Sequence, residues 1–348
     1  MKAMDEGFRL WANPSSPHAE GRKARSLLEG ARERIKAMLG WDGELIFTSG
    51  ASEAAALALH HAKVRDFAMS TVEHTAMLWF ENDSDDAVEV GIDGGVLANS
   101  LEECVWAEHK KTKTGRAAEC NRRLIGVQHL NSETGNRQDI SAMAEIVHNG
   151  LGYLITDCSQ SAAKFALPKE ADFAIFAAHK FGGPIGVGAL LVKDFAMLAP
   201  TGGQERGYRP GTENLPGVLG MAEALDASGY PYLAADVLEP FDGLAEECRK
   251  LGGTWLSDRL SDPTPYIRAI AMPNMSATAQ VMRFDMAGIS VSQGSACSSG
   301  TMKTSRVLQA MQVEPEIAAN TIRVSVGWNT TRADVERFCE VWLDLARR

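Results

Sequence analysis

Short apolar runs alternate with amphipathic segments over the first two thirds of the chain. Residues 26–39 place apolar side chains at helical spacing and charges on the other face, which predicts an amphipathic helix. A strand-like run at 44–50 then passes through small residues into a helical segment at 51–62. The same alternation recurs at 123–135, 140–150, 153–161, 173–180 and 187–193. It predicts an α/β domain with a mostly parallel sheet, whose polar strand ends share one edge where ligands bind.

This alternation is lost after Pro216. A helical segment at 218–227 is followed by predicted strands and helices in mixed order, at 267–275, 289–300, 305–311, 321–330 and 332–348. We therefore expect a large α/β domain at 26–224 and a smaller α+β domain at 225–348, with residues 1–25 as an N-terminal segment of the small domain.

Composition and charge narrow the possible partners. Apolar residues make up 45% of the 348 residues, enough for a sizeable core. Thirty-five basic residues against 45 acidic ones give a net charge of -10, which argues against nucleic acid as a partner because phosphate neutralisation needs clustered Lys and Arg. No apolar run approaches the roughly 18 residues of a membrane helix, and the first residues form no hydrophobic signal core. We expect a soluble, cytoplasmic chain without a membrane partner.

The cysteines predict neither a disulfide framework nor a metal site, because they are scattered without a CxxC pair. A lone cysteine is usually a small buried hydrophobe. Cys297 differs, because it lies in a run of small side chains at 294–300 that predicts an exposed loop and an accessible thiol. The other five are expected to be structural: Cys104, Cys120, Cys158, Cys248 and Cys339.

Three polar features follow predicted strands. The segment 48–53 could bind an anion at the start of a helix, although Ser-Gly in that place is more often a plain cap. Asp157 could cap the next helix or point a carboxylate into the ligand crevice. Lys180 could reach solvent, or it could be a buried amine whose lowered pKa lets it form a Schiff base. Pyridoxal phosphate needs this combination of phosphate cradle, carboxylate at the ring nitrogen and lysine.

With these features in place, the sequence resembles the class V pyridoxal-phosphate enzymes, and among them the cysteine desulfurases of the iron–sulfur-cluster type. The resemblance implies an aspartate-aminotransferase-like fold and a homodimer. The matching motifs occur in family order across nearly the whole chain, at 13–25, 48–53, 72–76, 131–135, 157–161, 179–188, 202–214, 294–300 and 322–331.

The resemblance also implies roles for single residues. Lys180 would bind the cofactor covalently, Asp157 would pair with the ring nitrogen, and His74 would stack on the ring and take part in catalysis. Gln160 would bond the phenolic oxygen. The phosphate would be held by Ala51, Ser52, His179 and, from the neighbouring subunit, Thr212. The carboxylate of the substrate would be held by Asn131 and Arg323.

The implied reaction converts L-cysteine to L-alanine and leaves the sulfur as a persulfide on Cys297, for transfer to a sulfur-acceptor or cluster-scaffold protein. A class V aminotransferase, a selenocysteine lyase and an inactive sulfur-transfer scaffold are the alternatives. Two departures from the family motivate the last of these. An opening Asp-x-x-Ala-Thr-Thr-Pro-like segment is absent, and Ala177 stands where a phosphate-binding serine is common, which would remove one hydrogen bond.

Overall fold

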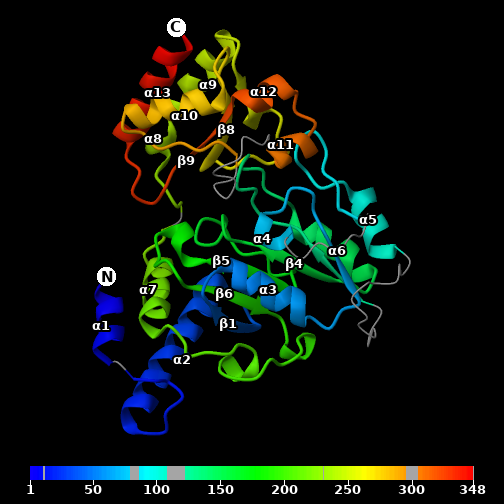
Figure 1. The fold of residues 1–348 in the computed structure, drawn as a ribbon, viewed down its shortest axis with the longest axis vertical. Coiled ribbons are helices and arrows are strands. Elements are labelled where there is room, and N and C mark those ends of the chain that lie inside the picture. Colours follow the sequence, from blue (N-terminus) through cyan, green and yellow to red (C-terminus); the bar gives the residue numbers. More distant parts are fainter. Residues whose placement is uncertain (11, 79–85, 108–121, 230, 295–304, 348) are drawn as a thin grey trace.

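The computed structural model describes residues 1–10, 12–78, 86–107, 122–229, 231–294 and 305–347. Its large domain is built on a six-stranded sheet in the order β1-β6-β5-β4-β3-β2 (Figure 1). The strands are β1 (Glu44–Thr48), β2 (Asp66–Met69), β3 (Arg123–Gly126), β4 (Tyr153–Asp157), β5 (Phe173–Ala177) and β6 (Gly188–Val192). The strands β2 to β5 are parallel, whereas β6 runs antiparallel to both of its neighbours. The predicted mostly parallel sheet is therefore confirmed.

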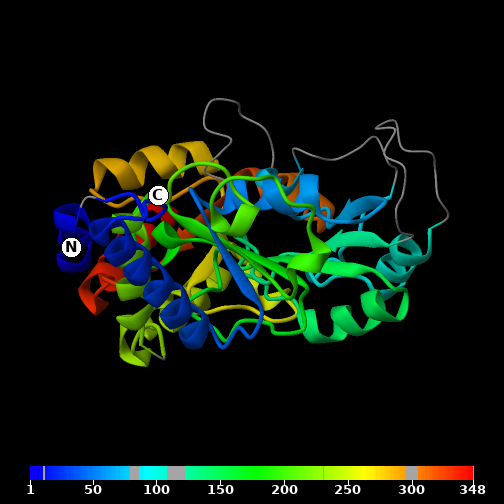
Figure 2. The ribbon, with the colours of Figure 1, turned by 90° about the horizontal axis from the view of Figure 1, so that it is seen from below.

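Helices cover both faces of this sheet (Figure 2). Alternate strand residues face opposite layers: Phe173 and Ile175 join the cluster under α3 (Ala51–His61), while Phe176 packs with α2 (Ala19–Leu39) and α7 (Leu215–Asp226). Two further helices, α5 (Ala98–Trp106) and α6 (Ile140–Asn149), lie over β3 and β4 on the side of α2 and α7. Buried on both faces, the central strands are apolar throughout.

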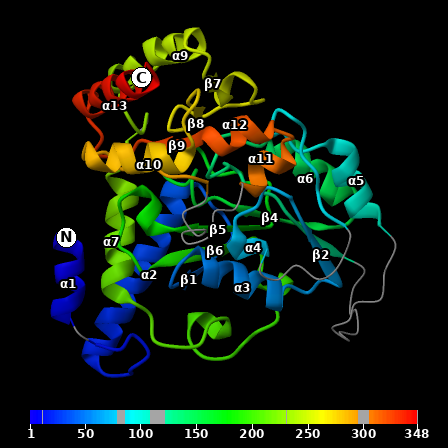
Figure 3. The same ribbon diagram turned by 45° about the horizontal axis from the view of Figure 1, so that its top comes forward.

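The small domain has a three-stranded antiparallel sheet of β7 (Thr254–Trp255), β8 (Ile267–Ala271) and β9 (Thr321–Ser325). One face packs on α9 (Pro240–Lys250), α10 (Ala277–Met286) and α13 (Arg332–Ala346). The other face carries α11 (Arg306–Ala310) and α12 (Pro315–Asn320), which join a cluster that includes Val72 and Val90 of the large domain (Figure 3). Side chains of both domains therefore share one apolar interface beside the strand ends.

Two local expectations differ from the structure. The first helix, α1 (Lys2–Leu10), packs against α7 of the large domain, in contrast to its expected place in the small domain. Gly7 permits this contact, because a Cβ there would come within 2.7 Å of Pro216 Cα. The strand expected from residue 289 is reduced to a single bridge between Ser292 and Arg323.

Candidate active site

A cavity of about 410 Å³ lies where β1, β4 and β5 end. This edge is where parallel α/β sheets bind ligands, because the strand carboxyl ends and the helix starts converge there. The wall brings together eight of the predicted residues, namely Ala51, Ser52, His74, Asp157, Gln160, His179, Lys180 and Arg323. They are drawn from the large domain and, in the case of Arg323, from the small one.

The start of α3 forms the first part of the wall. Its N-cap is Gly50, which offers no side-chain cap to the first turn of the helix. A Cβ at Gly50 would meet nothing within 4 Å, so the space beside these backbone N–H groups is open. Ser52 adds a hydroxyl group to the same wall. An open helix start with a hydroxyl group is a good site for a phosphate.

Asp157 ends β4 and is 9% exposed. Its Oδ1 accepts the Ser159 N–H at 2.8 Å, so the carboxylate shapes the following turn and also reaches the cavity. The segment between β4 and β5 contains no helix, so Asp157 caps a turn and not the expected helix, and its carboxylate lies at the cavity. Beside it, the Ser159 Oγ is buried and has no hydrogen-bond partner among the described residues, although the side chain lines the cavity.

Lys180 lies in a 3-10 helix, Ala178–Phe181, that directly follows β5. Gly182 ends this helix at φ 88, a left-handed conformation that glycine adopts without strain. The strand is buried, but the Lys180 side chain is exposed at the cavity, so in this chain by itself the lysine reaches solvent, the first of the two alternatives considered for it. Partial burial and the neighbouring charge of Lys180 lower the pKa of His179.

His74 precedes the short helix α4 (Thr75–Leu78) and accepts the Ala76 N–H on Nδ1 at 3.2 Å. Burial lowers the pKa of its imidazole, and the charge of Lys180 acts in the same direction, whereas Asp157 opposes them. A ring that is neutral at neutral pH suits stacking on a flat heteroaromatic group.

The small domain contributes Arg323 on β9 to the cavity wall. Its Nη1 donates to the Ser132 carbonyl at 3.0 Å and its Nη2 to Ser292 Oγ at 3.1 Å, so its guanidinium group is held between the two domains. Asn131 does not reach the wall, because it is 2% exposed and its Oδ1 accepts the N–H groups of Glu133 and Thr134. Its neighbour Ser132 lines the cavity instead.

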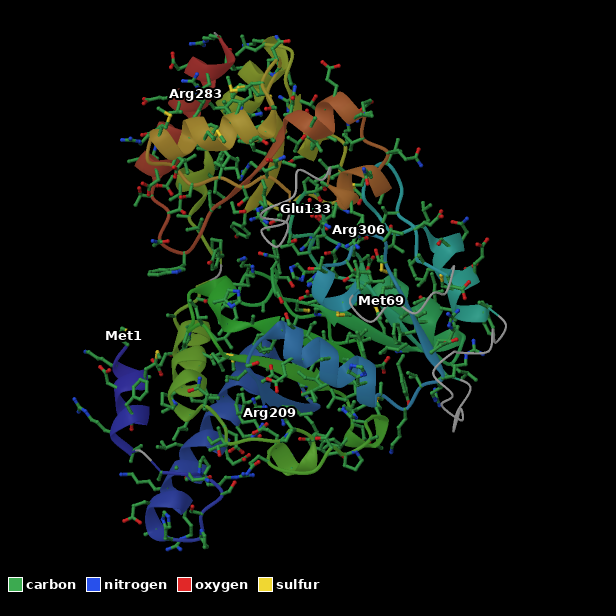
Figure 4. The ribbon with its side chains drawn as sticks, in the orientation of Figure 1. Met1, Met69, Glu133, Arg209, Arg283 and Arg306 are labelled. Atoms are coloured by element: carbon green, nitrogen blue, oxygen red, sulfur yellow. The ribbon has the colours of Figure 1, made fainter. Side chains whose placement is uncertain are left out.

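A second cavity of about 400 Å³ shares Arg323 with the first. Glu133 forms part of its wall and accepts the hydroxyl proton of Ser305 at 2.6 Å. Glu133 and Arg306 lie between the domains (Figure 4). Burial raises the pKa of Glu133, while Ser305, Arg323 and Arg306 act against it.

Sequence reasoning missed a buried acid behind the cavity. Glu73 is 2% exposed, and its Oε1 accepts the N–H of the cavity residue Gln128 at 2.7 Å. Burial raises the pKa of Glu73 well above its usual range, and the neighbouring Asp157 adds to this effect. The available signal was a charged residue in the otherwise apolar and small-residue run before His74.

Of the remaining predicted residues, one is absent from this cavity and one cannot be placed. Thr212 is exposed and is absent from the described wall of this chain. Cys297 lies outside the described residues. Cys158 is fully buried, and burial raises the pKa of its thiol to about 12, in agreement with a structural role.

The described residues contain no cluster of three or more His, Cys, Asp or Glu side chains that could hold a metal ion. Nor does the described part of the chain contain a helix long and apolar enough to cross a membrane. The cavity residues do fit pyridoxal phosphate. The open start of α3 would hold its phosphate, the Asp157 carboxylate would face its ring nitrogen and the Lys180 amine would react with its aldehyde. The Ser159 hydroxyl group is left for a further polar contact.

Known proteins resemble the whole chain. The family model described as Aminotransferase class-V matches residues 1–338. A cysteine desulfurase of Cereibacter sphaeroides is 33% identical over 95% of this chain and 87% of its own length. Cysteine desulfurase IscS 1 of Archaeoglobus fulgidus is 31% identical over 95% of this chain and 88% of its own length.

Solved structures give the same result. The NifS-like protein of Rickettsia africae has a TM-score of 0.84 and 26% identity, covering 100% of this chain and 96% of that one. SspA in complex with cysteine has a TM-score of 0.74 and 25% identity, covering 94% of this chain and 95% of that one. The chain therefore belongs to the class-V aminotransferase family of pyridoxal-phosphate-dependent enzymes, in its cysteine desulfurase branch.

Proposed function

We propose that this enzyme converts L-cysteine to L-alanine and carries the released sulfur as a persulfide on Cys297. The observation that supports this most strongly is the meeting of Lys180, Asp157 and His74 in one cavity with Arg323 of the small domain. One end of that cavity suits a phosphorylated ring and the other suits an amino-acid carboxylate. The structure of SspA with cysteine, a related fold, is consistent with L-cysteine as the substrate.

In this proposal, the cofactor is held by residues of several elements. Lys180 would bind it covalently, Asp157 would face its ring nitrogen and His74 would stack on its ring. Gln160 would bond its phenolic oxygen. Its phosphate would be held by Ala51, Ser52, His179 and the Thr212 of a second copy of the chain. When bound, pyridoxal phosphate supplies an electron sink for the bonds at the substrate Cα.

The side chains of the protein supply binding and proton transfer. Arg323 binds the substrate carboxylate, because a planar guanidinium matches its two oxygens. Asn131 orders the turn 131–135 that presents the Ser132 carbonyl to Arg323, and so supports this contact. Lys180 Nζ moves the proton of the substrate Cα.

The sulfur is transferred to Cys297. Its thiolate attacks the sulfur of the substrate, so an S–S bond forms while the substrate Cβ–S bond breaks. The carbon side retains the electron pair of the broken bond and is protonated. One thiol and one cysteine thus become one persulfide and one alanine, and no external oxidant is required.

We further infer a homodimer, because Thr212 lies on an exposed segment rather than at the cavity of its own chain. The persulfide then passes to a sulfur-acceptor or cluster-scaffold protein. A cytoplasmic location fits this chemistry, since a reducing compartment keeps cysteines as free thiols. Cys104, Cys158, Cys248 and Cys339 are free and buried in the structure.

Replacing two cysteines separately tests the proposal. Cys297→Ser should retain the colour of the bound cofactor and the binding of L-cysteine, but should form no persulfide, because a hydroxyl group with a far higher pKa supplies no nucleophile at neutral pH. Cys158→Ser is the matched control and should retain turnover. The measurements are alanine release and mass spectrometry of the trapped persulfide. Undiminished sulfur release by Cys297→Ser would overturn the proposal in favour of an aminotransferase or lyase.

A further inference from the structure

Glu53 is an acid at the place proposed for the cofactor phosphate. It is the third residue of α3 and lines the cavity together with Ala51 and Ser52. Its Oε2 accepts the Ser49 N–H, so the carboxylate reaches back to the strand-to-helix turn. The positive end of a helix attracts a carboxylate as well as a phosphate. In this chain the two anions would share one helix start.

The Glu53 carboxylate is charged at neutral pH. Burial raises its pKa, but the hydrogen bonds from Arg209 and Ser49 together outweigh burial, so that the pKa lies below its usual value. Two anions in a partly buried site repel each other more strongly than in water. An unopposed charge on Glu53 would therefore weaken the binding of a phosphorylated ligand.

Arg209 supplies the opposing charge. Its Nε donates to Glu53 Oε1 at 2.9 Å and its Nη2 to Glu53 Oε2 at 3.4 Å, which is a two-pronged contact. The two side chains are only 17% and 28% exposed, respectively. Arg209 is the only described cation within 4 Å of the Glu53 carboxylate. A contact of this kind fixes the position of the acid as well as offsetting its charge.

The fold holds Arg209 in place through the segment between β6 and α7 (Figure 4). The Arg209 N–H donates to the Gln204 carbonyl at 3.4 Å, and the Gly211 N–H donates to Gln204 Oε1 at 3.1 Å. Arg209 Nη1 in turn donates to the Gly211 carbonyl at 3.3 Å. Gly207 and Gly211 permit these turns because they adopt φ values of 90 and 94. The guanidinium group thus meets α3 from a position 156 residues further along the chain than Glu53.

The other groups of the wall do not duplicate this effect. Ser52 and the backbone N–H groups of α3 carry no net charge. Burial and the charge of Lys180 lower the pKa of His179, so its ring is neutral at neutral pH. Lys180 and Arg323 have other proposed partners, namely the cofactor aldehyde and the substrate carboxylate. The charge next to the phosphate therefore depends on the pair of Glu53 and Arg209.

We propose that Arg209 is a positioning residue that, by pairing with Glu53, makes the start of α3 selective for phosphorylated over unphosphorylated pyridoxal. The inference rests on the proposed place of the cofactor phosphate at this helix start. Arg209 acts through Glu53: it cancels the repulsion that the carboxylate would exert on the phosphate dianion.

The test compares three variants of the full-length protein: Glu53→Gln, Arg209→Gln and the double variant that carries both. Gln at residue 53 keeps an acceptor for the Ser49 N–H. Fluorescence titration of the cofactor-depleted protein gives the dissociation constants of pyridoxal phosphate and of pyridoxal, which lacks the phosphate. Arg206→Gln is the matched control, because it removes a cation from the same segment that pairs with Glu44 at 2.6 Å and is absent from the described cavity wall.

We expect Arg209→Gln to raise the dissociation constant of pyridoxal phosphate about tenfold and Glu53→Gln to lower it by a similar factor, as for one unit charge near a dianion at a partly solvated site. The double variant should return to the value of the unaltered protein. Pyridoxal should bind all variants equally, and Arg206→Gln should bind both ligands as the unaltered protein does. A purely structural tie between α3 and the segment leading to Thr212 would instead weaken binding in all three variants.

Weaker binding of pyridoxal phosphate in Glu53→Gln, or a double variant as weak as Arg209→Gln, would overturn the inference and leave the pair a structural role. Equal changes for pyridoxal and pyridoxal phosphate would also overturn it. Borohydride reduction and peptide mapping identify the modified lysine in each variant, and a lysine other than Lys180 would show that the proposed cofactor site itself is wrong. If Arg209→Gln did not fold, Glu53→Gln alone would decide, because the two explanations predict opposite signs for it.

Discussion

Arg32 and Glu205 form a buried, two-pronged ion pair with N–O distances of 2.8 and 2.9 Å, and each side chain is 1% exposed. Glu205 Oε2 also accepts the Phe47 N–H at 2.8 Å, so the pair ties α2, β1 and the segment leading to Thr212 together. Both Glu205 and the following Arg206 have positive φ, at 48 and 57. Buried hydrogen bonds therefore stabilise a backbone conformation that this segment would not adopt alone.

Neutralising this pair should destabilise the protein. Glu205→Gln leaves the buried Arg32 guanidinium group with the partly exposed Glu29 as its remaining acidic partner among the described residues, and we expect the free energy of unfolding to fall by up to about 3 to 5 kcal/mol. Urea unfolding at pH 7 measures the loss. Glu223→Gln is the control, because its ion pair with Arg34 has a similar length, 2.9 Å, but lies half exposed and should contribute less than about 1 kcal/mol. Equal losses in the two variants would show that burial does not strengthen the Arg32 pair.

Introducing a hydroxyl group at residue 177, where a serine is common in the family, should tighten cofactor binding. Ala177 ends β5, lines the cavity and is 2% exposed. In Ala177→Ser, a hydrogen bond to the phosphate should lower the dissociation constant of pyridoxal phosphate by about tenfold or more, as for a hydrogen bond to a charged acceptor. Ser52→Ala should weaken binding by a comparable factor. Fluorescence titration of the cofactor-depleted protein gives both values, and unchanged affinity in Ala177→Ser would place the phosphate away from the end of β5.

The buried acid Glu73 should make stability depend on pH. Because its pKa is raised well above the ordinary 4.5, the unfolded chain releases this proton at lower pH than the folded one. The contribution of Glu73 to stability is thus complete below about pH 4.5 and is lost as the pH rises. Glu73→Gln keeps an acceptor for the Gln128 N–H without a titrating group, so its stability relative to the unaltered protein should increase from pH 5 to pH 8. Urea unfolding at both pH values measures this difference, and an equal difference at both would contradict the prediction.

Lys164 is buried in the turn after β4 and should carry a stability cost at neutral pH. In the unfolded chain its amine binds a proton below pH 10.5, but in the folded protein only below about 8, so the free energy of unfolding falls as the pH drops through this window. At roughly 1.4 kcal/mol for each pH unit, the cost is at most about 3.5 kcal/mol. Lys164→Met should therefore be more stable than the unaltered protein at pH 7, with the advantage shrinking towards pH 10. Thermal unfolding at pH 7 and pH 9 tests the sign, and a less stable Lys164→Met at pH 7 would contradict it.

Local patterns account for much of the fold. Apolar runs such as 173–177 and 188–192 lie at the observed strands, because residues buried on both faces of a sheet must be apolar. Small residues at 49–52 mark the strand-to-helix turn, and Asp157 and Lys180 lie at strand ends, where side chains converge on one edge. The order of the motifs along the chain also indicated the family, and the comparisons confirmed it.

Local sequence patterns do not predict contacts between segments that are far apart in the chain. The place of α1 on α7 depends on the absence of a Cβ at Gly7, and the antiparallel direction of β6 depends on a short connection from β5. Tertiary packing decides which side chains surround a residue. For this reason Lys180 is exposed, Asn131 is buried and Lys164 lies against the ring of Tyr232. The sequence by itself therefore determined most of the elements, the family and eight of the residues that line the cavity, because these depend on residue type and local order. Only the tertiary structure decided burial, ionisation and counter-ions, because these depend on neighbours that are far apart in the chain.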